Sequence, residues 1–307
     1  MTNCFNGWGK SIRKYWQLYL LLVPVVAYYV IFKYIPILGL QIAFKDFSLK
    51  AGIWGSEWTG FDHFIKFFKS YNFATTMKNT IIISFFSLLF TFPASIIVAL
   101  LVNELRSNWS KKLVQTLTYA PHFLSTVVVI GLTTTMLSPS TGIINKLLLK
   151  FGILEEAYYF TMKPGWFVPL YILTAIWQNA GWGAIIYISA LSAIDQEQYE
   201  AARVDGASRW QQLIYVTIPG IIPTVITMLI LESAKILNVG YEKVFLMQKS
   251  SNLLVSEVIS TYVYRMGIVS GNYDYATAVG LFNSVINFAM LIIVNRICKK
   301  NTETSLW

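Results

Sequence analysis

The sequence carries little charge for its length. Only 13% of its 307 residues are Asp, Glu, Lys or Arg, whereas soluble domains usually carry about 25%. Hydrophobic residues make up 55% of the chain, and the mean hydropathy is +0.55. Two uncharged runs, residues 79–103 and 164–194, each exceed the roughly 20 apolar residues that a bilayer-spanning helix needs. These features exclude a soluble globular protein and predict a polytopic membrane protein.

Several chemical features are also absent. The two cysteines, Cys4 and Cys298, lie at opposite ends beside basic residues, so neither a disulfide framework nor a metal site is expected. The chain lacks a GxxxxGK(S/T) phosphate loop and therefore supplies no ATPase of its own. No Ser–His–Asp or Cys–His pair is placed for chemistry, which predicts a non-enzymatic protein. The net charge of +9 is ascribed to membrane-face residues that set topology, so no nucleic acid partner is expected.

The apolar runs predict six transmembrane helices in one membrane domain, residues 1–307, without an internal repeat. The first run lacks a small-residue cleavage site and is expected to be a retained span, not a signal peptide. The cluster FIKFFK, Phe64–Lys69, predicts an interfacial amphipathic helix. The fold class is all-α integral membrane, with predicted spans at about residues 15–40, 79–103, 113–137, 166–194, 220–239 and 275–295.

The basic residues predict the orientation of these spans. Six spans place both termini on one side of the membrane. That side carries 11 Lys and Arg residues in short segments, whereas the other 13 are spread over nearly twice the length. Because Lys and Arg are enriched in short cytoplasmic loops, both termini are expected in the cytoplasm of a plasma-membrane protein.

The longest polar interruption in the second half of the chain is residues 195–219. Asp195 is a candidate N-cap, with Gln198 at the position of a capping-box partner. Gly206 suits a left-handed stop after the first helix, and Pro219 suits the entry to the next apolar run. The pattern predicts two short helices joined at a glycine. On pattern alone, a docking surface and a plain connector carry equal weight.

The spacing within this segment is specific. Glu-Ala-Ala is followed by three residues, glycine, nine residues and Val-Thr-Ile-Pro, which resembles the EAA loop of ABC-importer permease subunits, EAA-x3-G-x9-I-x-L-P. Gln196 departs from the proline expected at the first helical turn, where proline is merely favoured. The resemblance implies a cytoplasmic coupling helix that docks on an ATPase subunit, through Glu200, Ala201, Ala202, Asp205, Gly206 and Pro219.

The resemblance covers nearly the whole chain. YLLLVPVVAYYVIFKYIPILGLQIAFKDF near the start, APHFLSTVVV, LNVGYEKVFLM and YDYATAVGLF are similar to carbohydrate-importer permeases of the LplB and alginate-importer type. This implies the type I ABC importer permease fold, a heterodimer with a second homologous permease, and two ATPase subunits that bind ATP and Mg²⁺. It also implies an extracellular solute-binding protein that delivers an oligosaccharide. No cofactor is expected in this chain itself.

Candidate route residues follow from polarity at membrane depth. Glu232 and Lys235 are three apart in the fifth predicted span, so they are expected to share a helix face, with Asn238 one turn on. They either line the sugar route or hold helices together, at even weight. Packing is favoured over ligand contact for a second set, the mid-span residues Trp177, Asn179, Trp182 and Tyr187.

Three further residues have simpler interpretations. His122, directly after Pro121, is expected to be a hydrogen-bond partner at a helix kink rather than a catalytic base. Glu242 and Lys243 are expected either as surface charges or as contacts for the binding protein.

An alternative function is an ion-gradient-driven secondary transporter or channel, with Glu232 and Lys235 as a proton relay. Two features favour the importer subunit. A coupling loop has no purpose without a motor, and six spans without an inverted repeat suit half of a transporter.

Overall fold

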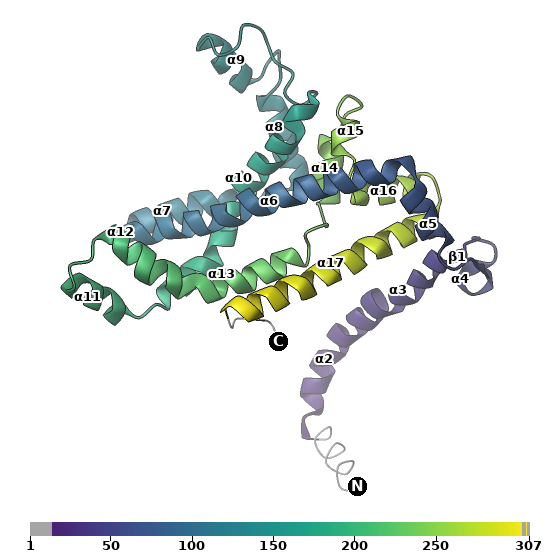
Figure 1. Cartoon of the computed structure of the whole chain (residues 1–307), viewed down its shortest axis with the longest axis horizontal. Coiled ribbons are helices and arrows are strands. Elements are labelled where there is room, and N and C mark those ends of the chain that lie inside the picture. The colour runs from purple at the N-terminus through teal and green to yellow at the C-terminus, as the bar shows by residue number, and fades with distance from the viewer. Residues whose placement is uncertain (1–13, 303–304, 306–307) are drawn as a thin grey trace.

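The computed structural model describes residues 14–302 and 305 and is almost entirely helical (Figure 1). Cys4 therefore lies outside the described residues. The long helices are α2 (Trp16–Tyr29), α6 (Tyr71–Glu104), α7 (Asn108–Tyr119), α10 (Phe167–Ser192), α13 (Ile218–Ser233) and α17 (Tyr273–Thr302).

The first predicted span stands apart from the other helices in Figure 1. Its helical run covers Trp16–Phe44, and no residue of its most apolar stretch is buried. This run consists of α2, η1 (Val30–Tyr34), α3 (Ile35–Ile37) and η2 (Leu38–Phe44). Only its end, η2, packs on α17. Because every side of α2 is apolar, lipid or another chain must cover it.

Short elements follow η2 at the right-hand end of Figure 1. They are β1 (Lys45–Asp46), α4 (Gly52–Gly55), β2 (Glu57–Trp58) and α5 (Asp62–Lys69), with β1 and β2 antiparallel. The predicted helix at Phe64–Lys69 is confirmed as part of α5. Its Phe67 is buried in a cluster of aromatic rings with Phe73, Tyr262, Tyr275 and Phe282.

The centre of the bundle is formed by α6 and α10, which pack along their length. Small residues allow this close approach. A Cβ on Gly183 would meet the Ser95 hydroxyl, and a Cβ on Gly181 would collide with the backbone of Thr118 in α7. Buried Ala99 and Ala184 lie in one cluster with Tyr187. Small residues therefore allow α10 to approach α6 and α7 closely.

The third predicted span, residues 113–137, is interrupted by a sharper bend than the kink expected at Pro121 and His122. The chain forms α7, a short η3 (Ala120–Phe123) and α8 (Thr126–Met136), and the two halves are bent by 100°. Pro121 removes one helical hydrogen bond, and Leu124 and Ser125 adopt extended conformations. Gln178 of α10 donates to the freed Leu124 carbonyl at 2.9 Å, which stabilises the bend.

Within residues 14–302, we counted the helices that are long and apolar enough to cross a membrane. Four helices qualify, or five if the bent pair is one span. Helix α10 corresponds to the remaining predicted span. It carries no charged residue over 26 residues, but Gln178 and Asn179 lower its hydropathy. After α8, the chain projects outward through α9 (Ile143–Lys150) and returns through η4 (Pro164–Trp166) (Figure 1).

The segment 195–219 differs from the prediction of two short helices. The first helix, α11 (Gln196–Val204), is short, but the second continues without interruption from α12 (Arg209–Gln212) through η5 (Leu213–Thr217) into α13. The fifth span therefore begins earlier than expected and ends at Ser233 instead of residue 239. Pro219 lacks an N–H, and the wide turn η5 directly before it absorbs the missing bond.

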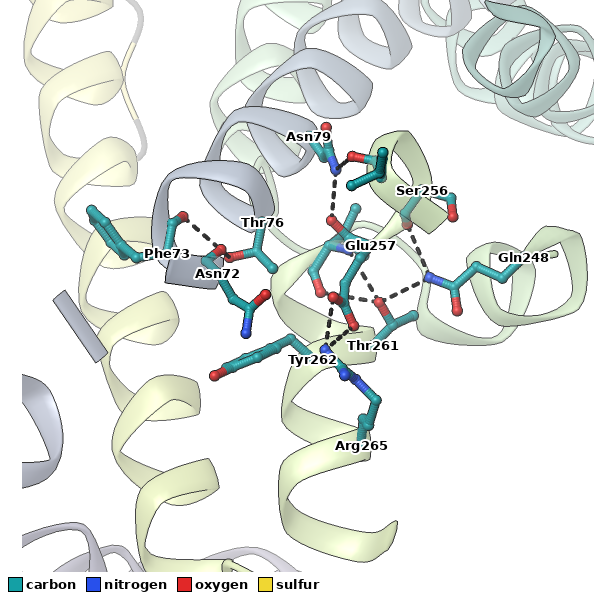
Figure 2. Close-up of polar contacts among 12 residues, drawn as sticks. Asn72, Phe73, Thr76, Asn79, Gln248, Ser256, Glu257, Thr261, Tyr262 and Arg265 are labelled. Atoms are coloured by element: carbon teal, nitrogen blue, oxygen red, sulfur yellow. Dashed lines mark hydrogen bonds and ion pairs between the residues drawn. The ribbon is translucent and has the colours of Figure 1, made fainter. Parts of the chain in front are cut away.

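The polar segment between α13 and α17 folds back into the bundle. It forms α14 (Tyr241–Met247), α15 (Leu253–Ser256), α16 (Ile259–Tyr264) and η6 (Arg265–Val269). Figure 2 shows the contacts that anchor it to α6. The Asn79 side chain donates to the carbonyls of Leu254 and Glu257 at 2.9 and 3.0 Å. Arg265 Nη2 lies 2.6 and 2.7 Å from the two carboxylate oxygens of buried Glu257.

Lys243 contradicts its predicted position at the surface. It is 9% exposed, donates from Nζ to the Tyr171 carbonyl at 2.9 Å and lies over the Tyr171 ring. Burial lowers the pKa of Lys243 to about 7, because removing water disfavours the ammonium form. Glu242 is exposed, as a surface charge would be.

Candidate functional site

A cavity of about 420 Å³ opens between α6, α10 and the end of α13. This volume suits a small-molecule site. Six of the seven predicted route residues line it: Asn179, Trp182, Tyr187, Glu232, Lys235 and Asn238. Trp177 does not, and its side chain is half exposed elsewhere on α10.

The charged pair lies at the mouth of this cavity. Lys235 Nζ is 3.8 Å from Glu232 Oε1, with the two side chains 66% and 43% exposed. The two side chains lie together as predicted, although α13 ends at Ser233 and Lys235 lies in the turn beyond it. An ion pair this exposed contributes at most about 1 kcal/mol to stability, so the two charges are available to other partners.

Helix α17 positions Asn238 at the cavity. The side-chain amides of Asn283 and Asn287 both donate to Asn238 Oδ1 at 3.0 Å. The Leu237 N–H donates to Asn287 Oδ1 at 2.9 Å, which holds the irregular backbone beyond α13. Because Asn238 Oδ1 is occupied, its amide nitrogen is the group left for a ligand.

Sequence reasoning missed one wall of the cavity. Helix α6 presents a row of hydroxyls at helical spacing, Ser84, Ser87, Thr91 and Ser95. In the described part of the chain, the hydroxyls of Ser84, Ser87 and Thr91 are buried without a hydrogen-bond partner. Buried hydroxyls are normally paired, so three unpaired ones on a cavity wall make this wall a candidate for binding. Their spacing of three and four residues was the signal that could have found them.

The bend at η3 reaches the same cavity. His122 Nδ1 lies 3.1 Å from Asn179 Oδ1, which confirms its predicted role as a hydrogen-bond partner at the kink. The His122 ring stacks on Trp182 at 4.6 Å between centroids with 5° between planes, and Phe123 meets the same indole edge-on. The bend therefore fixes the orientation of Asn179 and Trp182.

The segment 195–219 lies at the far left of Figure 1, at one end of α13. Asp195 caps α11 as predicted, since its side chain accepts from the Glu197 N–H at 3.0 Å. Gly206 has a φ of 77°, which confirms the left-handed stop. The capping box expected at Gln198 lies instead at α12, between Ser208 and Gln211.

The motif residues face outward from this end. Glu200, Ala201, Asp205, Gly206 and Pro219 are exposed, and Ala202 is half-buried. Two large apolar side chains beside them are also uncovered: Val204 is 88% exposed and Trp210 is 69% exposed. On the inner side, the Tyr199 hydroxyl bonds Thr217 at 3.0 Å and ties α11 to the long helix.

Comparisons with known proteins agree with these features. The chain is 43% identical over 301 residues to "Protein LplB" of Bacillus subtilis, covering 98% of this chain and 94% of LplB. It is 41% identical over 290 residues to the "Polygalacturonan/rhamnogalacturonan transport system permease protein YteP" of the same species, covering 94% and 90%.

The fold has a close counterpart among solved structures. A chain of a bacterial ABC transporter involved in the import of the acidic polysaccharide alginate superposes with a TM-score of 0.88 at 42% identity, covering 95% of this chain and 98% of that one. The same transporter in complex with its alginate pentasaccharide-bound periplasmic protein gives 0.88 at 41% identity, covering 97% and 99%. Residues 91–301 match the family described as "Binding-protein-dependent transport system inner membrane component". The chain is a multi-pass membrane protein that belongs to this family of transport permeases.

Proposed function

We propose that this chain is a permease subunit of an ATP-driven importer that carries an oligosaccharide across the plasma membrane. The relatives named above include a permease for pectic polysaccharides and a chain of an alginate importer. The cavity offers hydroxyls, amides and an indole ring, which are the groups that bind sugars by hydrogen bonds and stacking. Lys235 and Glu232 add charges that could select among neutral and acidic sugars.

One observation carries the proposal: the helix from Arg209 to Ser233 is continuous. Its first end follows the exposed α11, and its last turn carries Glu232 at the cavity. A helix transmits displacement as a rigid element, so a push on α11 moves the cavity wall. The site has no catalytic role in this account, because ATP and Mg²⁺ are bound by a separate ATPase pair.

The exposed face of α11 has the chemistry of a docking surface for that ATPase. Ala201 and Ala202 permit close approach, Val204 supplies apolar area, and Glu200 offers a carboxylate for a basic group of the partner. The orientation that follows places both termini and α11 in the cytoplasm, with the binding protein at the opposite end of the bundle.

The cavity requires a second permease to complete it. It is open at one side, and the hydroxyls of Ser87 and Thr91 have no partner among the described residues. Helix α2 is likewise uncovered by its own chain. A homologous second chain would close the route and cover α2, so we infer a heterodimer.

The test is the coupling between ATP hydrolysis and sugar uptake in the reconstituted importer. Glu200→Ala and Gly206→Pro should leave assembly largely intact and abolish ATP-driven uptake, because docking or the angle after α11 is lost. Glu197→Ala, an exposed neighbour on α11 outside the motif, is the control. Unchanged uptake in both motif variants would refute the proposal, and uptake driven by an ion gradient without ATP would favour a secondary transporter.

The substrate route has its own test. Glu232→Gln keeps the shape of the side chain and should change sugar uptake more than complex stability, because the ion pair is exposed. If folded complex and uptake fall in parallel, Glu232 holds helices together and is not part of the route.

A further inference from the structure

A second cavity, of about 580 Å³, lies at the α11 end of the molecule. It is bounded by the connector between α6 and α7, by α11, and by the start of the long helix at α12. Four of its lining residues are cations and one is an acid: Arg106, Lys111, Arg203, Arg209 and Glu104. The cations come from separate elements, so the fold, not a run in the sequence, brings them to one cavity.

These cations have no carboxylate partner in the part of the chain that the structure describes. Two neutral lining groups, by contrast, have hydrogen-bond partners: Tyr199 bonds Thr217, and Gln212 donates to the Ala207 carbonyl at 2.9 Å. Four positive charges around one space repel one another unless an anion enters it.

The orientation of the chain in the membrane does not by itself explain why these four cations lie around one cavity. The positive-inside rule requires basic residues in the loop, and it is indifferent to where their side chains lie. Lys112 satisfies the rule as well as Lys111 does, yet it does not line the cavity. Of the three basic residues in this part of the chain, only Arg106 and Lys111 line the cavity.

Exposed aromatic residues flank the same elements. Trp109 of α7 is 72% exposed, Trp210 of α12 is 69% exposed and Tyr215 of η5 is 75% exposed. Trp and Tyr concentrate at the level of the lipid headgroups, where one end of the ring is apolar and the other is wet. This belt positions the cavity at headgroup depth.

We propose that the cavity binds the phosphate of an anionic phospholipid from the cytoplasmic leaflet. Basic pockets at the ends of transmembrane helices bind such headgroups, and a phosphodiester pairs well with guanidinium groups. A bound headgroup bridges the connector to Arg203 of α11 and to Arg209, and so fixes the coupling helix against the bundle. The inference goes beyond sugar transport but rests on the cytoplasmic orientation proposed above.

The experiment uses the complete purified importer, with its ATPase, in nanodiscs of phosphatidylcholine and increasing phosphatidylglycerol. Native mass spectrometry counts phosphatidylglycerol bound per complex. Each cation near an anionic headgroup strengthens lipid binding about fivefold. Lys111→Gln should therefore weaken binding about fivefold, and the double variant Arg106→Gln/Lys111→Gln about 25-fold. Lys112→Gln is the matched control and should bind as the unmodified protein does. An equal loss in Lys111→Gln and Lys112→Gln would overturn the proposal, because general surface charge would explain it.

Two further arms separate the sources of the anion. Inorganic phosphate and glycerol phosphate are added as soluble competitors. If either displaces phosphatidylglycerol fully at low millimolar concentration, the ligand is a soluble phosphate and the lipid assignment fails. If the lipid binds only after the ATPase is stripped away, an acidic part of that subunit fills the cavity, which also overturns the proposal. Lipid binding is measured without transport, so its failure is distinct from failure of the importer function.

Discussion

Two polar segments interrupt the apolar helices in the second half of the chain, and they differ in how far their side chains are buried. In residues 195–219, only Thr217 is buried. In residues 237–272, polar side chains enter the core, among them Lys243, Asn252, Ser256, Glu257 and Thr261. The first segment leaves apolar Val204 exposed, whereas the second buries the Glu257 carboxylate and pairs it with half-exposed Arg265 (Figure 2).

The difference shows where the partners of each segment lie. The groups of 237–272 are satisfied by their own chain, through Asn79, Tyr171 and Arg265. The motif face of 195–219 has few such contacts, as expected of the docking surface proposed above. Substitutions should therefore cost stability in the second segment and coupling in the first. The following predictions test that division, from the largest expected change in stability to the smallest.

The largest loss is expected for Glu257→Ala. The change leaves the Arg265 guanidinium without its carboxylate, and removing one partner of a buried ion pair is strongly destabilising. Because the Arg265 side chain is 42% exposed, water compensates in part, and we expect a loss of roughly 2 kcal/mol. Thermal unfolding of the detergent-purified protein measures it. Exposed Glu242→Ala serves as control, and an equally small effect of both would contradict the division.

A pH dependence is expected next, from Lys243. Its folded pKa is about 7, against 10.5 for the free side chain, so the unfolded chain binds more protons between these values. Stability should therefore fall by about 1 kcal/mol as the pH drops from 8 to 7, and the decline should level off at lower pH. Lys243→Met should remove this slope. A slope that persists in the variant would assign the dependence to another group.

The coupling segment was predictable from sequence because its signals are local. The cap at Asp195 and the left-handed glycine at 206 depend on backbone chemistry within a few residues, whereas the spacing from Glu200 to Pro219 was recognised by its resemblance to a family motif. The buried segment has no such signal. Lys243 and Glu242 are adjacent and both charged, and only the packing of α10 against α14 decides that one is buried. The same limit applies to the cavity, where Trp177 and Trp182 could not be separated.

A smaller and local effect is expected for Asp195→Ala. Loss of an N-cap costs about 1 kcal/mol, but α11 is exposed and can fray without unfolding the bundle. Hydrogen exchange at residues 196–204 should accelerate about fivefold while the melting temperature is unchanged. Gln198→Ala is the control, since its side chain makes no capping box. A lowered melting temperature for Asp195→Ala would mean that α11 is integral to the fold.

The smallest change in stability is expected for Val204→Ser. This substitution should also separate an effect on stability from an effect on docking most clearly. The side chain is 88% exposed, so the substitution should alter the free energy of unfolding by less than about 0.5 kcal/mol. If the ATPase buries Val204, docking loses about 1.5 kcal/mol or more of apolar contact, which is roughly tenfold in affinity. Sugar-stimulated ATP hydrolysis should fall accordingly, and Val204→Ile should retain it. If Val204→Ser instead destabilises the protein and leaves sugar-stimulated ATP hydrolysis unchanged, the exposed face is not a docking surface. Val204 would then stabilise its own chain and would not contact the ATPase.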